Sequence, residues 1–358
     1  MLNALRAVVD PDLHKDIVSL GFVKDLTIEG GRAAFTIELT TPACPAKDRL
    51  RDQATAAVRA VPGVSDVQVQ LTAKVRGATF PEGNRPPVAG VKNVIAVGAG
   101  KGGVGKTTVS VNLALALARC GSRVGILDGD MYGPNVPIML GLNDAHLGTD
   151  GQRIVPAEKY GLQIVSIGFL TNDDSPIIWR GPMLHQAVQQ FFREVAWKDL
   201  DYLIIDLPPG TGDVALSLSQ TVPVVGSVVV TTPQQVSLAD SRRAIRMYQK
   251  LNIPTLGVVE NMSYHRCTNC HHESDLFGHG GGERMAAEMN VPFLGRLPVY
   301  QPIREGGDVG VPLVVAEPAS EAARAFLTVA ERTAAQVAIA AHKNAEANKG
   351  KIPLIPVR

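Results

Sequence analysis

A glycine-rich segment, residues 98–108, has the residue types and spacing of a loop that holds phosphate groups. It contains Gly100-x4-Gly105-Lys106-Thr107, the P-loop pattern. Glycines allow backbone N–H groups to turn towards phosphate oxygens, and the N-terminus of a following helix favours an anion. The pattern predicts a nucleoside-triphosphate site in which Lys106 reaches the outer phosphates and Thr107 holds Mg²⁺. The predicted nucleotide-binding residues of this loop are Gly100, Lys101, Gly102, Gly103, Val104, Gly105, Lys106, Thr107 and Thr108.

Carboxylates follow two apolar runs that predict buried strands. Asp128 and Asp130 end one run, and Asp206 ends the other. Ligands of an open parallel sheet bind at the carboxyl ends of its strands, so we expect these groups to face the phosphates. Asp128 and Asp206 would contribute to Mg²⁺ binding, and Asp130 would orient the attacking water. Capping of the strand end is the alternative for Asp128 and Asp130.

A cysteine pair, Cys267-x2-Cys270, is followed directly by His271 and His272. The pattern of c-type haem attachment needs an exported chain, and a thioredoxin-like pair needs a thioredoxin-type unit around it. A structural zinc site needs four ligands, for which the two histidines could serve. A [4Fe–4S] cluster takes four thiolates, and two copies of the chain could supply two each.

The elements that position these residues alternate along residues 91–338. Near-continuous apolar strands between helices favour an α/β fold, with a mostly parallel sheet covered by helices on both faces. The predicted strands are residues 94–97, 124–127, 163–167, 202–205, 227–230, 255–259 and 293–294. The predicted helices at the two ends of this block are residues 108–119 and 319–342.

The first 75 residues predict a small α/β domain of their own. A hairpin signal, Glu29-Gly30-Gly31-Arg32, separates two strand patterns, and a proline- and glycine-rich stretch follows the domain. The predicted elements are strands over 23–28, 33–39 and 66–71 and a helix over 45–60. The predicted boundaries are domain 1–75, linker 76–90, P-loop ATPase domain 91–342 and flexible tail 343–358.

Composition narrows the functional class. The chain has 358 residues, 45% apolar and 19% charged, with a net charge of +1. This balance gives no reason to expect nucleic acid or an anionic membrane as a partner. No apolar run approaches the ~20 residues that span a bilayer, and residues 1–10 lack the features of a secretion signal. We expect a cytoplasmic protein whose four cysteines are thiols or metal ligands rather than disulfides.

A second loop lysine, Lys101, is not needed for the nucleotide of its own chain. A solvated lysine is one interpretation. However, the run Lys101-Gly-Gly-x-Gly-Lys-Thr107 resembles the deviant loop of the nitrogenase-iron-protein, MinD and ParA superfamily. This resemblance implies a homodimer in which Lys101 reaches the partner's nucleotide. Catalytic roles are therefore predicted for Lys101, Lys106, Asp130 and Asp206.

Residues 91–315 as a whole resemble the Mrp/ApbC family of iron–sulfur cluster carrier ATPases. The carrying segments are the phosphate loop, Asp128-Gly-Asp-Met-Tyr-Gly-Pro134, Trp179-Arg-Gly-Pro182, Asp206-Leu-Pro-Pro-Gly-Thr-Gly-Asp213, Cys267-x2-Cys270, Phe277-Gly-His-Gly-Gly-Gly282 and Ile303-Arg-Glu-Gly-Gly-Asp308. The resemblance implies ATP and Mg²⁺ at the loop, Asn261 near the adenine, and a [4Fe–4S] cluster at Cys267 and Cys270.

The N-terminal block is similar to stand-alone iron–sulfur assembly factors. Asp10-Pro-Asp12, Asp16-Ile-Val-x-Leu-Gly21 and Leu39-Thr-Thr-Pro-Ala-Cys-Pro45 carry this likeness. Cys44 is expected to start a helix, whose N-terminus would favour the thiolate. Cys44 is therefore a candidate accessory cluster ligand, and a thiol without function is the alternative. Cys120, at the end of a helix pattern, is expected to pack in the core.

The sequence therefore predicts a homodimeric ATPase that carries a labile [4Fe–4S] cluster to apo iron–sulfur client proteins from a cluster donor. One alternative is a positioning ATPase of the MinD or ParA kind with a structural zinc at the cysteine pair. That class would use a basic amphipathic helix or a basic face, and the residues 319–342 contain few basic side chains. Another is an electron-transfer ATPase like the nitrogenase iron protein, whose cluster cysteines are far apart in sequence.

Overall fold

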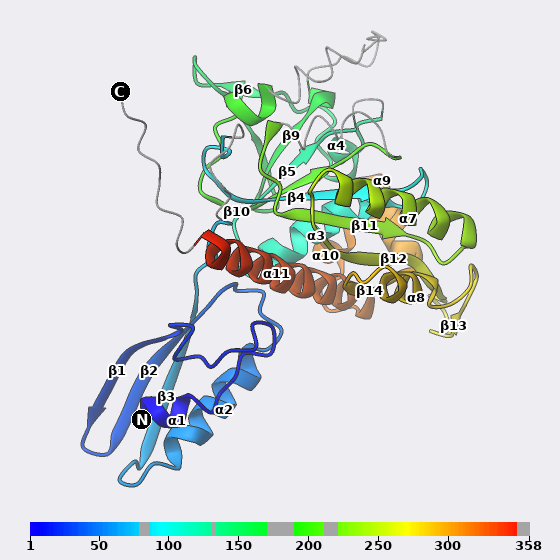
Figure 1. The fold of residues 1–358 in the computed structure, drawn as a ribbon. Coiled ribbons are helices and arrows are strands. Elements are labelled where there is room, and N and C mark those ends of the chain that lie inside the picture. The colour runs from blue at the N-terminus through cyan, green and yellow to red at the C-terminus, as the bar shows by residue number, and fades with distance from the viewer. Residues whose placement is uncertain (79–85, 131–132, 170–189, 211–220, 349–358) are drawn as a thin grey trace.

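The computed structural model describes residues 1–78, 86–130, 133–169, 190–210 and 221–348. Parts of the predicted linker (79–85) and tail (349–358) lie outside these ranges, as do residues 131–132, 179–182 and 211–213 of the segments that carry the family resemblance. Figure 1 shows a larger domain built on a twisted sheet and a smaller N-terminal domain beside it.

The larger domain is built on one sheet with the strand order β13-β12-β11-β4-β10-β5-β9-β8, and β14 also pairs with β12. All pairs are parallel except β12 with β13 and β8 with β9. The strands are β4 (Val91–Ala99), β5 (Val124–Asp128), β8 (Ala157–Lys159), β9 (Leu162–Ser166), β10 (Leu200–Asp206), β11 (Gly226–Thr231), β12 (Thr255–Arg266), β13 (Glu273–Ser274) and β14 (Phe293–Val299). A separate short hairpin joins β6 (Gly148–Thr149) and β7 (Ile154–Val155).

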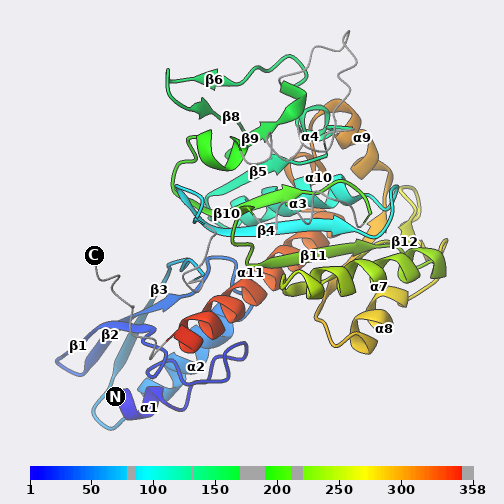
Figure 2. The same cartoon turned by 45° about the horizontal axis from the view of Figure 1, so that its top comes forward.

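Helices cover both faces of this sheet, so the predicted architecture is confirmed (Figure 2). One core cluster includes α3 (Lys106–Arg119), α10 (Leu313–Ala316) and α11 (Glu321–Asn348). The opposite cluster includes α7 (Gln235–Lys250) and α8 (Gly281–Glu288). Shorter elements are α4 (Val136–Met139), η1 (Ile167–Phe169) and α9 (Gln301–Val309).

The N-terminal domain has a three-stranded sheet and one long helix. Strands β1 (Val23–Glu29) and β2 (Arg32–Leu39) are antiparallel, and β2 runs parallel to β3 (Asp66–Ala73). Alternate residues of β2 are buried, as the period of two in its sequence predicts. They form a core with α1 (Leu2–Leu5) and α2 (Lys47–Arg59).

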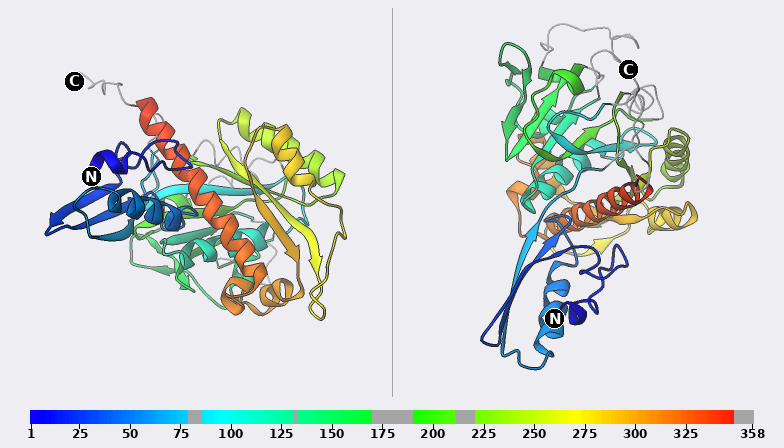
Figure 3. Two further views of the ribbon diagram at one scale, coloured as in Figure 1. Left: turned by 90° about the horizontal axis from the view of Figure 1, so that it is seen from below. Right: turned by 60° about the vertical axis from the view of Figure 1, so that its left-hand side comes forward.

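The two domains pack against each other along α11. The hydroxyl of Tyr202 on β10 donates to Thr41 of the N-terminal domain at 3.0 Å. Ala43 and Val75 belong to the same buried cluster as α3 and α11. Near the end of α11, Glu346 forms an ion pair with Lys15, and Figure 3 shows the N-terminal domain against this end of the helix.

Helix α11 is longer than the sequence predicted. It continues to Asn348, so residues 343–348 of the predicted tail are helical. The last turns pack towards the N-terminal domain, and such a contact stabilises helix beyond what local propensity indicates. Within the described part of the chain, no helix combines the length and the apolar character that crossing a bilayer requires.

Candidate functional site

The phosphate loop connects the end of β4 to α3 and requires glycine at defined positions. Helix α3 starts at Lys106, and its N-cap Gly105 has a φ of +78°, which glycine adopts without steric cost. A Cβ on Gly105 would also lie 2.3 Å from Asn261 Nδ2, and a Cβ on Gly100 would lie 2.2 Å from the carbonyl carbon of Asp240. Conformation and close packing therefore both select glycine here.

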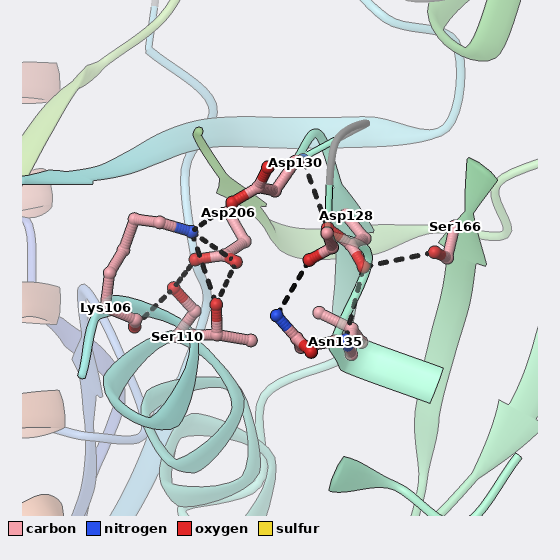
Figure 4. A network of polar contacts seen from close by, with 10 residues as sticks. Lys106, Ser110, Asp128, Asp130, Asn135, Ser166 and Asp206 are labelled. Carbon is pink, nitrogen blue, oxygen red and sulfur yellow. Dashed lines mark hydrogen bonds and ion pairs between the residues drawn. The ribbon is translucent and has the colours of Figure 1, made fainter. Parts of the chain in front are cut away.

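Side chains from the start of α3 converge on Asp206 at the end of β10 (Figure 4). Lys106 Nζ lies 2.6 Å from Asp206 Oδ2, and the Thr107 hydroxyl donates to the same oxygen at 2.7 Å. The Ser110 hydroxyl donates to Asp206 Oδ1 at 2.5 Å. Asp206 is fully buried, and these donors provide hydrogen-bond partners for both of its carboxylate oxygens. Lys106 Nζ also lies 3.9 Å from the carboxylate of Asp130.

Ser110 was not among the predicted site residues. It lies four positions after Lys106 on the same helix, and side chains at that spacing share one helix face. This spacing was the available signal.

Asp128, at the end of β5, is buried beside the same cluster. Its carboxylate accepts hydrogen bonds from the backbone N–H groups of Asp130 at 3.1 Å and Val136 at 3.2 Å, and from the Ser166 hydroxyl at 3.1 Å (Figure 4). Burial, followed by the charge of Asp206, raises the pKa of Asp128 to about 7. These contacts cap the strand end, and a role of Asp128 towards Mg²⁺ stays a prediction.

Asp128→Asn will remove the pH dependence that the Asp128 carboxyl gives to the free energy of unfolding. Because the pKa of Asp128 rises from 3.8 to about 7 on folding, the stability that this group contributes is complete below pH 3.8 and is lost as the pH rises to about 7. We expect the free energy of unfolding of the wild type, relative to that of the variant, to fall by about 2–3 kcal/mol between about pH 5 and about pH 7. Denaturant unfolding without nucleotide measures this. A pH-independent difference would contradict the assignment.

A cavity of about 650 Å³ opens over the phosphate loop. The exposed Lys101 lines it, together with most of the predicted loop residues and Asp130. A further wall comes from β14, α9 and the turn between them. The sequence analysis used residues 303–308 of this wall only for the family resemblance and did not assign them to the site. The residues of this wall are Pro298, Val299, Tyr300, Ile303, Arg304, Gly307 and Asp308.

Asn261, on β12, lies at the same cavity. Its Nδ2 donates to the backbone oxygen of Val104 at 2.8 Å, and the side chain is 6% exposed. Asn261 therefore braces the phosphate loop directly, and its predicted proximity to the adenine stays a prediction.

The cysteine pair lies in the turn that connects β12 to β13. The N–H of Cys267 donates to the carbonyl of His272, and the N–H of His271 donates to the carbonyl of Cys267, each at 3.0 Å. Backbone N–H groups of Cys270 and Asn269 lower the pKa of the Cys267 thiol. Cys267 is half-buried and Cys270 is exposed. The turn therefore presents two thiols and favours the thiolate form of one, which is the form that binds metals.

The two thiols do not form a complete metal site within one chain. Among the residues that the structure describes, no three His, Cys, Asp or Glu side chains gather to hold a metal ion. In particular, His271 and His272 do not complete the four-ligand set that structural zinc requires.

The expectation that a helix N-terminus favours the thiolate of Cys44 is wrong. Helix α2 starts at Lys47 with Ala46 as its N-cap, so Cys44 lies before the helix. Its side chain packs in the N-terminal core with 5% exposure, and burial above all raises the pKa of this thiol to about 11. The role of Cys44 as an accessory ligand stays a prediction. Cys120 packs against the core of the larger domain, as expected.

The order of strand, glycine-dependent loop and helix, with Lys106 and Asp206 in contact at its base, defines a P-loop nucleoside triphosphatase. Residues 90–334 match the model of the NUBPL iron-transfer P-loop NTPase family. The chain belongs to this family and is an ATPase. In addition, residues 1–71 match the iron–sulfur cluster assembly protein model.

The two relatives described next share one name. The iron–sulfur cluster carrier protein of Synechocystis is 48% identical over 347 residues, which cover 95% of this chain and 98% of the relative. The iron–sulfur cluster carrier protein of Escherichia coli K12 is 45% identical over 292 residues, 81% of this chain and 79% of the relative. The positioning-ATPase and zinc alternative is not favoured by these matches.

Solved structures confirm the fold class. A nucleotide-binding protein from Archaeoglobus fulgidus, in complex with ADP, is 35% identical with a TM-score of 0.58 and covers 65% of this chain and 91% of its own. The cell division ATPase MinD of Pyrococcus furiosus is 25% identical with a TM-score of 0.50, over 67% of this chain and 97% of its own.

Proposed function

We propose that this protein is a cytoplasmic ATP-dependent carrier that holds a labile [4Fe–4S] cluster between two copies of the chain and delivers it to apo client proteins. The main support for this proposal is the cysteine turn. There, Cys267 and Cys270 present two thiols, and no third metal ligand gathers with them in the described residues. Because a [4Fe–4S] cluster takes four thiolates, two such turns complete one binding site. The family match and the names of the relatives support this cargo.

The nucleotide site has a donor set that fits Mg²⁺. The Thr107 hydroxyl and the Asp206 carboxylate present oxygen atoms 2.7 Å apart, and Asp128 adds a buried carboxyl beside them; oxygen ligands suit this cation. When bound, Mg²⁺ would neutralise charge on the phosphates.

The residues of the chain supply the remaining functions of the site. The loop N–H groups and Lys106 would hold the phosphates, and Asp130 would orient the attacking water. Asn261 and the wall between β14 and α9 would enclose the base, since they line the same cavity.

The test is anaerobic reconstitution of the full chain with iron and sulfide. We expect about four irons for each dimer, a Mössbauer spectrum of a [4Fe–4S] cluster, dimer mass in size-exclusion chromatography, and reactivation of an apo iron–sulfur enzyme. One tightly held zinc in each monomer, with no iron uptake, would overturn the proposal.

Lys101→Ala tests the proposed contact across the dimer. Lys101 is exposed at the rim of the cavity, so its side chain can extend towards a partner copy without a rearrangement of the loop. We expect kcat for ATP hydrolysis to fall about tenfold or more, as when a charge supplied in trans is removed, with the Kd for ADP nearly unchanged. Lys250→Ala, an exposed lysine at the end of α7, is the control. Turnover equal to that of wild type would show that Lys101 acts only as a solvated residue.

A further inference from the structure

Strand β12 connects the nucleotide cavity to the cysteine turn. Asn261 and Met262 line the cavity, and Cys267 directly follows the last residue of the strand. The segment that follows the cysteine turn also lines the cavity. Phe277, which precedes α8 in the chain, is one of the residues of the cavity wall. A nucleotide in this cavity would therefore contact the segments on both sides of the cysteines.

The backbone of β12 is irregular between these two sites. Met262 has a φ of +53°, which is uncommon for a residue with a side chain. The register of β12 against β14 also shifts between Glu260 and Tyr264. Such an irregularity gives up ladder hydrogen bonds and needs other contacts to hold one conformation.

Glu260 provides those contacts. It is fully buried on β12, where it pairs with Thr231 of β11. Its carboxylate accepts hydrogen bonds from the Ser263 hydroxyl at 2.5 Å and from the backbone N–H of Gly282. The first contact closes the irregular stretch of β12, and the second ties that stretch to the start of α8.

The packing around this carboxylate leaves little freedom. A Cβ on Gly282 would lie 3.0 Å from both Cβ and Oε2 of Glu260, so a side chain at this position would displace Glu260 by a few tenths of an ångström. The N–H groups in the first turn of a helix favour a negative charge, and Gly282 lies in the first turn of α8. A buried carboxylate with these two partners therefore anchors both ends of the segment that carries the cysteines.

We propose that Glu260 is a positioning residue that couples the occupancy of the nucleotide cavity to the conformation of the cysteine turn. Nucleotide contacts with Asn261, Met262 and Phe277 would act on a unit that the Glu260 carboxylate holds together. The importance of this coupling for cluster binding rests on the proposed function. The coupling itself is a property of the cluster-free chain.

The experiment measures alkylation of the thiols in the full cluster-free chain. Iodoacetamide is added with and without Mg-ADP, and mass spectrometry follows the peptide that contains Cys267 and Cys270. We expect Mg-ADP to slow alkylation of wild type about fivefold or more, within the usual range of coupling between sites. In Glu260→Gln this nucleotide effect is expected to disappear, because an amide replaces one acceptor oxygen with a donor, while the Kd for ADP stays close to that of wild type.

Glu283→Gln is the matched control, because it makes the same change at an exposed carboxylate on α8, the helix whose first turn Glu260 contacts. Ser263→Ala is a milder second variant, which removes one hydrogen bond to Glu260 and should reduce the effect if Glu260→Gln does not fold. The proposal would be overturned if Mg-ADP had no effect on alkylation of the wild type. It would also be overturned if Mg-ADP slowed alkylation of Glu260→Gln and Ser263→Ala as strongly as that of the wild type.

The same variants, reconstituted with iron and sulfide, separate this inference from the proposed function. If Glu260→Gln has a normal iron content but Mg-ADP no longer affects its iron release to a chelator, the result supports both the coupling and the carrier function. An Mg-ADP effect on alkylation in a chain that takes up no iron supports the coupling alone and contradicts the carrier function.

Discussion

Lys106→Ala will reduce ATP hydrolysis by about 10²-fold or more, because one preorganised charge on a transferring phosphoryl group has at least that effect. In the structure the Lys106 ammonium lies at the floor of the nucleotide cavity, 2.6 Å from Asp206 and 7% exposed. No other described lysine is held within the phosphate loop at comparable burial. Steady-state phosphate release from the full chain measures the effect.

The variant also removes a partner of a buried carboxylate, so its folding needs a separate check. Lys106→Gln retains a donor that can reach Asp206 and is the second variant. Circular dichroism should show that Lys106→Gln folds. Its ATP hydrolysis should be reduced as strongly as that of Lys106→Ala. Lys250→Ala is the control for loss of a surface charge. Turnover retained in a folded Lys106→Gln chain would refute the assignment of the loop.

Cys270→Ala will abolish cluster binding. If each chain contributes two thiolates to one cluster, the variant dimer has two ligands in place of four, which is too few for a [4Fe–4S] cluster. We expect iron and sulfide reconstitution to give no cluster absorbance at this site, while ADP binds with the wild-type Kd. Cys267→Ala should behave in the same way.

Cys120→Ala is the matched control for the cysteine variants. Cys120 is a half-buried thiol that packs against the core, so its loss should leave the iron content unchanged. If Cys270→Ala retained about four irons for each dimer, the cluster would have to bind elsewhere. Cys44 would then be the next residue to change.

The features that sequence predicted are those whose requirements are local. The phosphate loop can be recognised because Gly105 needs a positive φ and Gly100 needs close packing, so that residue type and conformation are linked within a few positions. The strands of the sheet are predictable because burial on both faces gives short apolar runs. The cysteine pair is visible from its spacing, whereas its assignment to a cluster came from the family resemblance.

The remaining features depend on neighbours from distant parts of the chain. The pKa of Asp128 rises because β9 and β10 enclose it, which no local pattern reports. Cys44 was expected at a helix start, but α2 begins at Lys47 and the thiol enters the core. Glu260 resembles an ordinary acidic residue in sequence, and its second partner comes only from the return of the chain at Gly282.

Helix α11 separates the two thiol-bearing regions of one chain (Figure 3). Glu321, at its first turn, contacts Arg266 beside Cys267, whereas Glu331, ten positions later, acts on the charge state of Cys44. Ten helical residues span roughly 15 Å, and a metal–sulfur bond is only about 2.3 Å long. In this conformation α11 therefore holds the cysteine turn and the region of Cys44 at different points along its length.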